Sequence, residues 1–388
     1  MKVRGRVLVL AVSLPVIAFA VIGGFMGKAM ARDDSYQYLR IFEDVVSLIV
    51  DNYVEEVNVD KVMHGAMHGL ADGLDPDSAF LDAQQVQALD KAAPAGEGQT
   101  GLEVTRQYYL RVIAARDGSP AARAGLMPGD YIRAIDGQST RDTTVYEGER
   151  LLRGKPGTPV SLTVLRGSAA EPHIVEVVRE NLPAAPVKGR IAAPGIGYLR
   201  IVEFDKATAG QIKSELASLT KAGASRLVID VRGTAFGDAE AGLDAAKLFV
   251  KDAVLGYRQD RGKEKDPFSS SAGDGGVTMP TTLLTDNGTS GAAEVFAAAL
   301  WGNKRTTLIG ERTFGRAAKQ KLVRLPDGSA LMLTHLVYLT PASVAIHERG
   351  LVPDIAVAQA EVDFGQPTPT EDPTLEKAIE SFTQKTAA

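Results

Sequence analysis

The N-terminus carries the first strong hydrophobic pattern of the chain. An uncharged, mostly apolar run of 19 residues extends from Val7 to Phe25, and Ala29 and Ala31 follow it with small side chains at alternate positions. Basic residues precede this run at Lys2, Arg4 and Arg6. The pattern is typical of an export signal, and its length is close to the ~20 residues that span a bilayer. We expect residues 1–31 to be a signal peptide or an inner-membrane anchor, which places the folded part in the cell envelope or periplasm.

Two amphipathic helices are predicted after this segment. Apolar side chains recur at helical spacing from Tyr38 to Val57 and predict one buried stripe, and a second helix is predicted from Val59 to Leu74. His64 and His68 lie one turn apart on the second helix, which is a spacing that metal sites use. Since no cysteine or third ligand is nearby, we interpret them as solvent-facing or packing residues and expect no metal.

Strands and helices alternate in the second half of the chain, after a proline-containing linker at residues 183–186. The expected elements are a strand from Ile196 to Val202, a helix from Ala207 to Ala222, a strand from Arg226 to Val231 and a helix from Ala239 to Val250. This alternation predicts an α/β fold whose parallel sheet is covered on both faces. Residues 262–276 lack periodicity and are predicted to form a mobile loop, and residues 372–383 are predicted to form a final helix.

Composition narrows the partners and the chemistry. The 388 residues carry a net charge of −5, which leaves no broad basic surface, so we expect no nucleic-acid partner. The chain has no cysteine, which excludes disulfides, zinc thiolate sites and thiol chemistry. No nucleotide-binding motif is present, and we expect no cofactor.

Short motifs follow one another in a fixed order along the chain. They are Leu74 to Ser78, Ser119 to Asp130, Ile135 to Gly137, Leu152 to Val160, Gly195 to Ile201, Leu227 to Arg232, Gly310 to Arg316 and Gly350 to Asp354. In this order they resemble the C-terminal processing peptidases, serine proteases of the tail-specific type. The resemblance implies a multidomain protein in the α/β class: its peptidase core is α/β, and the whole chain, with its helical region and PDZ domain, is a multidomain α+β arrangement. Its expected parts are an N-terminal helical region at 35–95, a PDZ domain at 96–182, a peptidase core at 183–362 and a tail with a short helix at 363–388.

The resemblance implies a catalytic dyad, and both of its positions are changed here. The family uses a serine nucleophile and a lysine base, and that lysine must be neutral to accept a proton. Gly291 stands at the serine position and Arg316 at the lysine position, while Gln320 is retained where a glutamine helps to orient the lysine. A glycine has no nucleophilic atom and a guanidinium stays protonated at physiological pH. We therefore expect no catalytic residues at these positions.

The loop that builds the family's oxyanion hole is also changed. The family pattern Asn-Pro-Gly-Gly is replaced by residues 233–237, with Phe236 in place of a glycine and Gly237 after it. A bulky residue is costly where the backbone needs positive φ, so we expect this loop to have a different shape. An acidic residue that precedes the family's His-Lys-Arg is replaced by Gly302.

A shifted dyad is the competing hypothesis. Ser290 lies one residue before the nucleophile position and Lys319 three residues after the base position, so these two are the alternative nucleophile and base. If a helix begins at Gly291, a step of one residue turns a side chain by about 100°, which would point Ser290 away from the cleft. We interpret Ser290 and Thr289 as caps of this helix, with Glu294 adding a favourable charge in its first turn.

A buried Arg316 requires a partner for its charge. If it occupies the former lysine pocket, a carboxylate or several carbonyl groups must face it, because an unpaired buried charge is strongly destabilising. On sequence proximity, Glu311 and Asp286 are the expected partners. An Arg316 side chain that points into solvent would contradict this expectation.

The PDZ-like region predicts a peptide-binding site. Such a domain adds an extended chain to a sheet edge and holds the terminal carboxylate with backbone amides of a loop. Thr100, Gly101, Leu102 and Glu103 lie where the resemblance places that loop. We expect protein or peptide C-termini, or a partner protease, to bind here. The family's N-terminal helices can also support a homodimer.

These features favour a noncatalytic, exported homologue of the processing peptidases that binds chain ends or a partner protease and regulates or scaffolds proteolysis. The changed positions Gly291 and Arg316 support this interpretation. One alternative is an active serine endopeptidase that uses Ser290 and Lys319. The other is a structural subunit whose PDZ groove is closed.

Overall fold

The computed structural model describes residues 36–91, 97–167, 171–360, 362–366 and 370–384. The chain divides into two compact units, residues 1–69 and residues 70–388. The predicted signal or anchor segment lies outside the described residues. Within the described part of the chain, no helix is both long and apolar enough to cross a membrane.

The described part of the first unit is mainly helical. Residues 36–52 form one helix, and helix α2 (Val59–Asp72) begins in this unit. The prediction of a buried stripe on the first helix was wrong, because several of its apolar side chains are exposed in the single chain: Leu39, Val45, Ile49 and Val50. None of these four belongs to a hydrophobic cluster of the described residues. The apolar spacing therefore reports the helical period correctly, but it does not report burial within one chain.

A short connecting region opens the second unit. It contains strand β1 (Ala79–Leu81) and helix α3 (Ala83–Asp90). Asp82 begins α3 with a reciprocal cap: its side chain accepts the Gln85 N–H at 2.8 Å, and the Gln85 side chain accepts the Asp82 N–H at 2.9 Å. Strand β1 then pairs with the distant strand β18 (Ala330–Leu339), which ties this region to the end of the chain.

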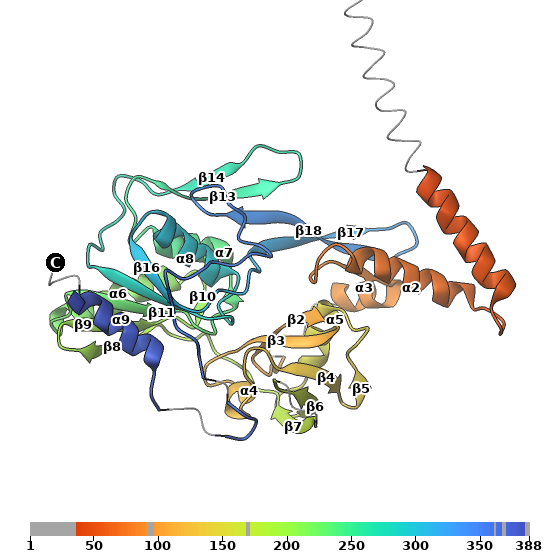
Figure 1. Ribbon diagram of the computed structural model, residues 1–388, viewed down its shortest axis with the longest axis horizontal. Helices are drawn as coiled ribbons and strands as arrows, with labels where there is room; N and C mark the ends of the chain where they lie inside the picture. Colours follow the sequence, from red (N-terminus) through yellow and green to blue (C-terminus); the bar gives the residue numbers. More distant parts are fainter. Residues whose placement is uncertain (1–35, 92–96, 168–170, 361, 367–369, 385–388) are drawn as a thin grey trace, which may run out of the picture. The chain divides into compact units, whose positions relative to one another are not determined.

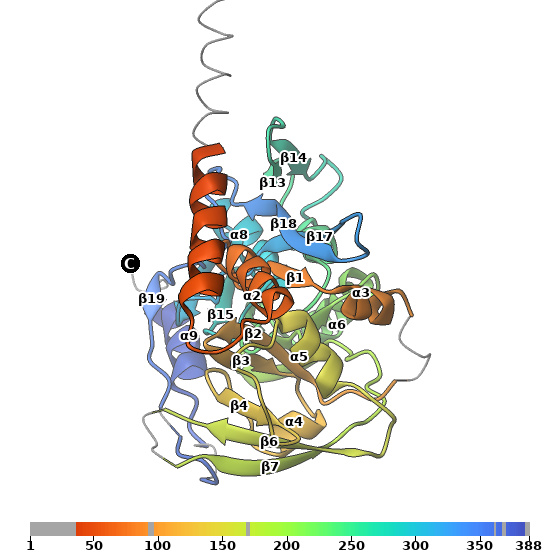
Figure 2. The same cartoon turned by 90° about the vertical axis from the view of Figure 1, so that its right-hand side faces the viewer.

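A six-stranded sheet follows in the region expected to be a PDZ domain. Its strands are β2 (Leu102–Gln107), β3 (Tyr109–Ala115), β4 (Tyr131–Ile135), β5 (Gln138–Ser139), β6 (Pro159–Leu165) and β7 (His173–Val178). The order β2-β3-β4-β6-β7, with β5 beside β4, leaves β2 at one edge. Helices α4 (Pro120–Arg123) and α5 (Val145–Leu152) belong to this region, and α5 lies against β2 (Figures 1 and 2).

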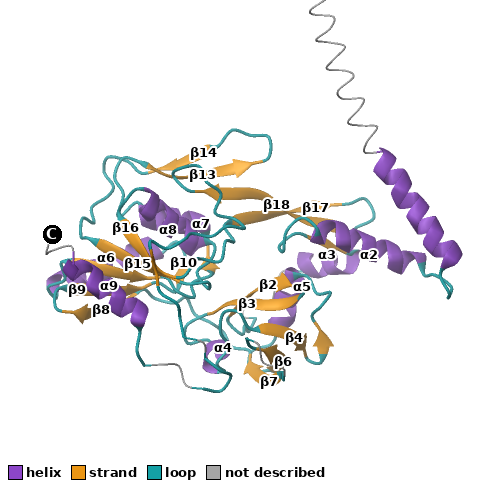
Figure 3. Cartoon of the chain, in the orientation of Figure 1, coloured by secondary structure: helices purple, strands orange, loops and turns teal. Residues whose placement is uncertain are grey.

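The central sheet of the core has the order β19-β16-β15-β11-β9-β8. Its strands are β8 (Lys188–Ala193), β9 (Ile196–Arg200), β11 (Arg226–Asp230), β15 (Thr281–Thr285), β16 (Thr306–Gly310) and β19 (Ile355–Ala356). All neighbours pair in parallel except β8 with β9. Helices α6 (Thr208–Lys221), α7 (Ala239–Ala246), α8 (Ala292–Gly302) and α9 (Pro373–Gln384) accompany the sheet (Figure 3).

Both faces of this sheet are covered, as the sequence predicted. Leu227 and Ile229 belong to the hydrophobic cluster that includes α6, α7 and α8, whereas Val228 between them packs in a separate cluster with Phe382 of α9. Successive side chains of a strand point to opposite faces, so β11 is buried on both sides. The α/β prediction for the core is therefore confirmed.

A second sheet lies beside the core, with the order β1-β18-β13-β14 and β17 (Ala318–Arg324) paired to β18. Strand β14 (Asp266–Ser269) falls inside the segment predicted to be a mobile loop, and it pairs with β13 (Val254–Asp260). Arg258 explains part of this order, because its guanidinium lies 2.7 Å from Asp266 and also faces the Phe268 ring. These contacts come from β13, so the composition of the segment alone did not reveal them.

Candidate functional site

The turn before α8 is built around a strained glycine. Gly291 follows strand β15 by six residues and has φ 59° and ψ −115°, a backbone conformation that L residues rarely adopt. A sharp strand-to-helix turn with a strained residue at its top is the geometry that exposes the nucleophile in many hydrolases. A Cβ added to Gly291 would meet only the Arg316 carbonyl oxygen, at 3.8 Å. The turn therefore has room for a side chain but presents none.

Asp286 organises the first half of this turn. Its carboxylate accepts the N–H groups of Gly288 at 3.0 Å and Gly233 at 2.8 Å, and the Thr289 hydroxyl lies 3.1 Å from it. Burial raises the pKa of Asp286 above its usual range. Because Asp286 is committed to these backbone groups, it does not pair with Arg316, and that part of the prediction was wrong.

Glu294 fixes the second half of the turn. This fully buried carboxylate accepts the N–H groups of Gly291 at 3.1 Å, Gly315 at 2.6 Å and Arg316 at 2.8 Å, and it also accepts the Thr313 hydroxyl. Burial raises the pKa of Glu294 to about 7. One side chain thus holds the start of α8 and the loop at residues 313–316 together.

The predicted capping role of Ser290 was wrong. Gly291 is the N-terminal cap residue of α8, and the N–H of Gly291 is bound by Glu294. Thr289 donates its hydroxyl to the Val231 carbonyl at 2.9 Å and so connects the turn to the neighbouring strand. The Glu294 side chain folds back over one helical turn to accept the Gly291 N–H. This contact takes the place of a cap from a serine or threonine hydroxyl.

Arg316 is paired with residues far away in the sequence. Its Nε lies 2.9 Å from Asp77 and one terminal nitrogen lies 2.5 Å from Glu103. The predicted partner Glu311 instead accepts the Gln359 N–H at 3.0 Å, so this expectation was also wrong. The Arg316 side chain reaches out of the core to the Asp77 turn and to strand β2 of the PDZ-like sheet, which proximity in sequence could not indicate.

Three carboxylates surround the Arg316 guanidinium. Burial raises the pKa of Glu103 to about 7, although Arg316 acts in the opposite direction. Burial also raises the pKa of Glu149 on α5, again opposed by Arg316. Burial acts against the charge of Arg316 itself, but Asp77, Glu103 and Glu149 outweigh it and raise the Arg316 pKa above its ordinary value. Arg316 is therefore a permanent cation within an acidic cluster and cannot act as a base.

Asp77 and Glu149 were not identified from the sequence as site residues. Asp77 stands where the related Leu-Asp-Pro-His-Ser turn has histidine, and an acid at this position is complementary to an arginine at the lysine position. That pairing of two unusual residues was the available signal. Nothing in the local sequence indicated Glu149, because its role depends on how α5 packs against β2.

A cavity of about 360 Å³ lies at the changed dyad. It is lined by Ser290, Gly291, Arg316, Lys319 and Gln320, among others. The structure thus brings the predicted positions together, and Ser290 is among the residues that line the cavity. Ser290 is only 2% exposed.

Lys319 is not prepared to act as a base. Its ammonium group lies 3.3 Å from Glu240 and 3.5 Å from Asp238, and no hydrogen bond joins it to Ser290 within the described part of the chain. Burial lowers the pKa of Lys319, but Tyr338 and the two carboxylates outweigh it and hold the pKa above the usual range. A lysine base needs the opposite shift.

The loop at the oxyanion position forms a short strand. Phe236 and Gly237 make up β12, which pairs in parallel with β10 (Glu203–Phe204). Positive φ occurs at Gly237, where an added Cβ would lie 2.1 Å from the Phe204 carbonyl oxygen, and not at Phe236. The strain expected for Phe236 is absent because the glycine after it takes the unusual conformation. Farther along the cavity, the Gln320 amide donates to the Thr334 hydroxyl at 3.3 Å.

The predicted peptide-binding loop leads into strand β2. Gly101 has φ 81°, and an added Cβ would lie 2.2 Å from the Ser119 side chain, so a glycine is required here. The carbonyl groups of Thr100 and Gly101 accept the N–H groups of Ala121 and Arg116 at 3.0 and 2.8 Å. These bonds hold the loop against the start of α4 and place Glu103 next to Arg316.

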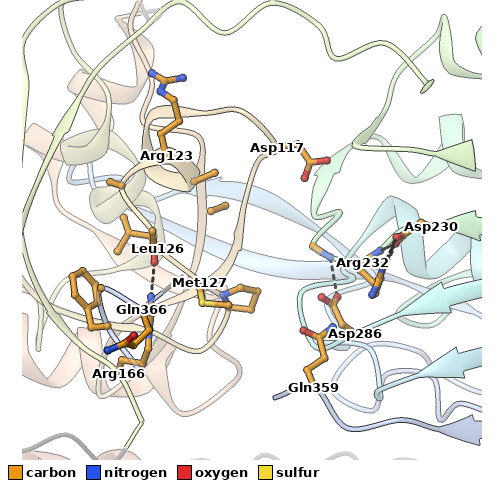
Figure 4. Close-up of a pocket in the computed structure, with 18 of the residues that line it drawn as sticks. Asp117, Arg123, Leu126, Met127, Arg166, Asp230, Arg232, Asp286, Gln359 and Gln366 are labelled. Atoms are coloured by element: carbon orange, nitrogen blue, oxygen red, sulfur yellow. Dashed lines mark hydrogen bonds and ion pairs between the residues drawn. The ribbon is translucent and has the colours of Figure 1, made fainter. Parts of the chain in front are cut away.

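A larger cavity, of about 830 Å³, lies between the PDZ-like region and the core. Figure 4 shows Leu126, Met127 and Arg166 on one wall, with Arg232 and Asp286 on the facing wall. The charges that line it are engaged: Arg232, for example, binds Asp372 at 2.7 Å. Arg200 of the core binds Asp117 of the PDZ-like region at 2.7 Å and so bridges the two walls. No pattern in the sequence indicated this cavity.

The structure gives no support to a metal site. Among the described residues, no group of three or more histidine and acidic side chains is arranged to hold a metal ion. His64 and His68 both lie on α2, as predicted.

The fold and the site define an α/β core of serine-peptidase type joined to a PDZ domain. Residues 195–357 match peptidase family S41, and residues 111–166 match a PDZ domain. The carboxy-terminal-processing protease of Bartonella bacilliformis is 30% identical over 334 residues, which are 84% of this chain and 77% of that protein. The carboxyl-terminal-processing protease of Synechocystis sp. is 32% identical and covers 80% of this chain and 74% of its own length.

A solved structure supports the same assignment. The photosystem II D1 C-terminal processing protease matches with a TM-score of 0.68 and 26% sequence identity, over 82% of this chain and 92% of its own. The chain belongs to peptidase family S41, and its relatives are carboxy-terminal processing proteases. The predicted family and fold class are therefore confirmed.

Proposed function

We propose that this protein is a noncatalytic, exported member of family S41 that binds protein C-termini or a partner protease and so regulates or scaffolds proteolysis. The observation that carries the proposal is the state of the dyad. Gly291 has no nucleophile, and Arg316 is held by Asp77 and Glu103 in ion pairs of 2.9 and 2.5 Å. A lysine base must lose its charge, whereas this acidic cluster stabilises a positive charge.

The backbone of the site supports the same function. The N–H of Gly291 donates to Glu294 at 3.1 Å, although an oxyanion hole requires backbone N–H groups that point at the substrate. The PDZ-like sheet keeps its edge strand β2 and the glycine-containing loop before it. An edge strand with such a loop supports the binding of a chain end, and the changed dyad supports the absence of cutting.

Cleavage is tested on the purified full-length protein. We expect no labelling by a fluorophosphonate probe and no cleavage of an unfolded protein substrate, and we expect Ser290→Ala to change neither result. Ser290 and Lys319 line the same cavity, so a shifted dyad is the competing outcome. Labelling or cleavage that disappears in Ser290→Ala would overturn the noncatalytic assignment.

Binding is tested separately with fluorescent peptides that end in a free carboxylate or in an amide. We expect saturable binding that requires the carboxylate, because the loop before a PDZ edge strand recognises that group. Absence of binding, or binding that is indifferent to amidation, would favour a structural subunit with a closed groove. A substitution at Gly101 serves as the variant, since a Cβ there would collide with Ser119 at 2.2 Å.

A further inference from the structure

Among the described residues, strand β2 pairs with β3 alone and so forms an edge of its sheet. The N–H and C=O groups of Val112 on β3 are directed to the β4 side, where they bond Asp130 and Gly129 at 2.8 and 2.9 Å. Val104 faces Val112 in the β2–β3 pairing. In an antiparallel pair, residues that do not bond each other direct their backbone groups away from the partner strand. The Val104 carbonyl therefore lies on the free edge of β2, where an added peptide strand would bond.

Arg316 of the core occupies this edge. One terminal nitrogen of its guanidinium lies 3.5 Å from the Val104 carbonyl oxygen and 2.5 Å from Glu103, the preceding residue of β2. Glu149 of α5, the helix that lies against β2, also acts on the Arg316 charge. The guanidinium thus contacts β2 directly and also interacts electrostatically with a carboxylate of α5.

The acidic cluster here contains more negative charge than Arg316 can neutralise. Asp77, Glu103 and Glu149 act on the Arg316 guanidinium, which can balance one carboxylate, and the only other cation that acts on the three within the described residues is Arg153, 4.0 Å from Glu149. The raised pKa values of Glu103 and Glu149 reflect this, since Asp77 repels both in addition to the effect of burial. A second cation from outside would relieve the repulsion, and a cation that replaced Arg316 at the edge would inherit two acidic partners.

We propose that Arg316 is an intramolecular competitor for the β2 edge, and that the preferred ligands are chain ends with a lysine or arginine side chain that replaces it beside Glu103 and Glu149. This inference rests on the proposed function, because it assumes that the edge binds C-termini. It adds the chemical class of the ligand and the means of regulation. Arg316, which stands at the family's base position, thus blocks the neighbouring edge of β2 until a ligand displaces it.

The test uses the full-length protein and short fluorescent peptides with a free C-terminal carboxylate. The peptides are identical except at one position near the C-terminus, which is lysine, norleucine or glutamate, so charge changes while length is kept. Binding is measured by fluorescence polarisation for wild type, Arg316→Gln and the control Arg324→Gln. Arg324 pairs with Asp90 on the surface, where both side chains are about half exposed (54% and 50%), so it controls for the loss of an arginine.

We expect Arg316→Gln to bind the lysine peptide about tenfold more tightly than wild type does, whereas its affinity for the norleucine peptide should differ from that of wild type by less than about threefold. Arg324→Gln should resemble wild type with all peptides. Equal gains for lysine and norleucine would overturn the ligand preference, and no gain for either would overturn the competition. Absence of binding by all three peptides, to wild type and to both variants, would instead reject the underlying proposal that chain ends bind.

A second variant keeps the proposal testable if Arg316→Gln does not fold. Glu149→Gln leaves Arg316 and its contacts to Asp77 and Glu103 in place, and the Glu149 side chain is 28% exposed, so the fold should tolerate it. We expect wild type to prefer the lysine peptide to the glutamate peptide and Glu149→Gln to reduce that preference at least about threefold. An unchanged preference would show that Glu149 does not face the ligand.

Discussion

Two charged residues meet at the loop at residues 313–316, and they differ in what they bind: Glu294 reaches the loop from α8, and Arg316 is part of it. Glu294 binds mainly backbone, through the N–H groups of Gly291, Gly315 and Arg316. The Arg316 side chain binds other side chains, Asp77 and Glu103, from distant segments. A residue that satisfies backbone groups fixes the course of the chain whatever its neighbours are. A residue that pairs with side chains can change together with them, so the catalytic frame persists here while its chemistry is replaced.

The strongest test of this comparison removes the charge of Arg316. We expect Arg316→Gln to lower the free energy of unfolding by about 3–5 kcal/mol at pH 8, because a buried acid that loses its partner is left uncompensated. Urea unfolding followed by circular dichroism measures this change. Arg324→Gln is the control, since its exposed pair with Asp90 should contribute little to stability. Similar losses in both variants would mean that Arg316 acts as an ordinary surface arginine.

The next test removes acceptors from the backbone frame. Glu294→Gln keeps the size of the side chain but replaces one acceptor oxygen by a donor, which leaves some of the N–H groups around it unsatisfied. Each unsatisfied buried donor costs about 1–3 kcal/mol, so we expect a loss of about 2–4 kcal/mol. The exposed Glu371→Gln should change stability little. If thermal unfolding shows equal effects for both variants, Glu294 is not the centre of the frame.

The titration of Glu103 tests the side-chain cluster around Arg316 separately from the backbone contacts of Glu294. Its pKa is raised from 4.5 to about 7 in the folded protein, so the folded state binds a proton more strongly than the unfolded state does. The stability that this proton contributes is present below pH 4.5 and is lost as the pH rises through about 7. Arg316, Glu149 and Asp77 are the charged groups that act on it.

We therefore expect the free energy of unfolding of wild type to fall by about 2 kcal/mol more than that of Glu103→Gln between pH 4.5 and 8. This figure allows for the partial exposure of the Glu103 side chain. The measurement is urea unfolding at a series of pH values, at constant ionic strength. Parallel curves for the two proteins would show that Glu103 keeps an ordinary pKa and that the acidic cluster is not crowded.

The sequence predicted what depends on local pattern. The strands at Ile196 and Arg226 begin where the pattern placed them, because a run of alternating or buried apolar residues is a property of the segment itself. The partners of Arg316 could not be predicted in this way, since Asp77 and Glu103 lie 239 and 213 residues away from it in the chain. The predicted cap at Ser290 was wrong for a related reason. A local hydroxyl was a reasonable cap, but Glu294 also had to bind the loop at 313–316, which the helix sequence does not show.

The smallest expected effect concerns Gly291, which is bound by Glu294 through its backbone N–H and also stands at the nucleophile position. Gly291→Ser restores a hydroxyl at the nucleophile position, and only the Arg316 carbonyl oxygen lies within 4 Å of the new Cβ, at 3.8 Å. The cost is therefore the strain of a side chain at φ 59°, which we expect to be about 1–2 kcal/mol. Gly210→Ser on the exposed part of α6 has open space and no positive φ, and it should not destabilise the protein.

We also expect no fluorophosphonate labelling of Gly291→Ser, alone or with Arg316→Lys, because Asp77 and Glu103 would keep a lysine at position 316 charged. Labelling of the double variant would mean that the acidic cluster does not control the charge at this position, and the contrast between a retained frame and a replaced chemistry would then rest on Gly291 alone.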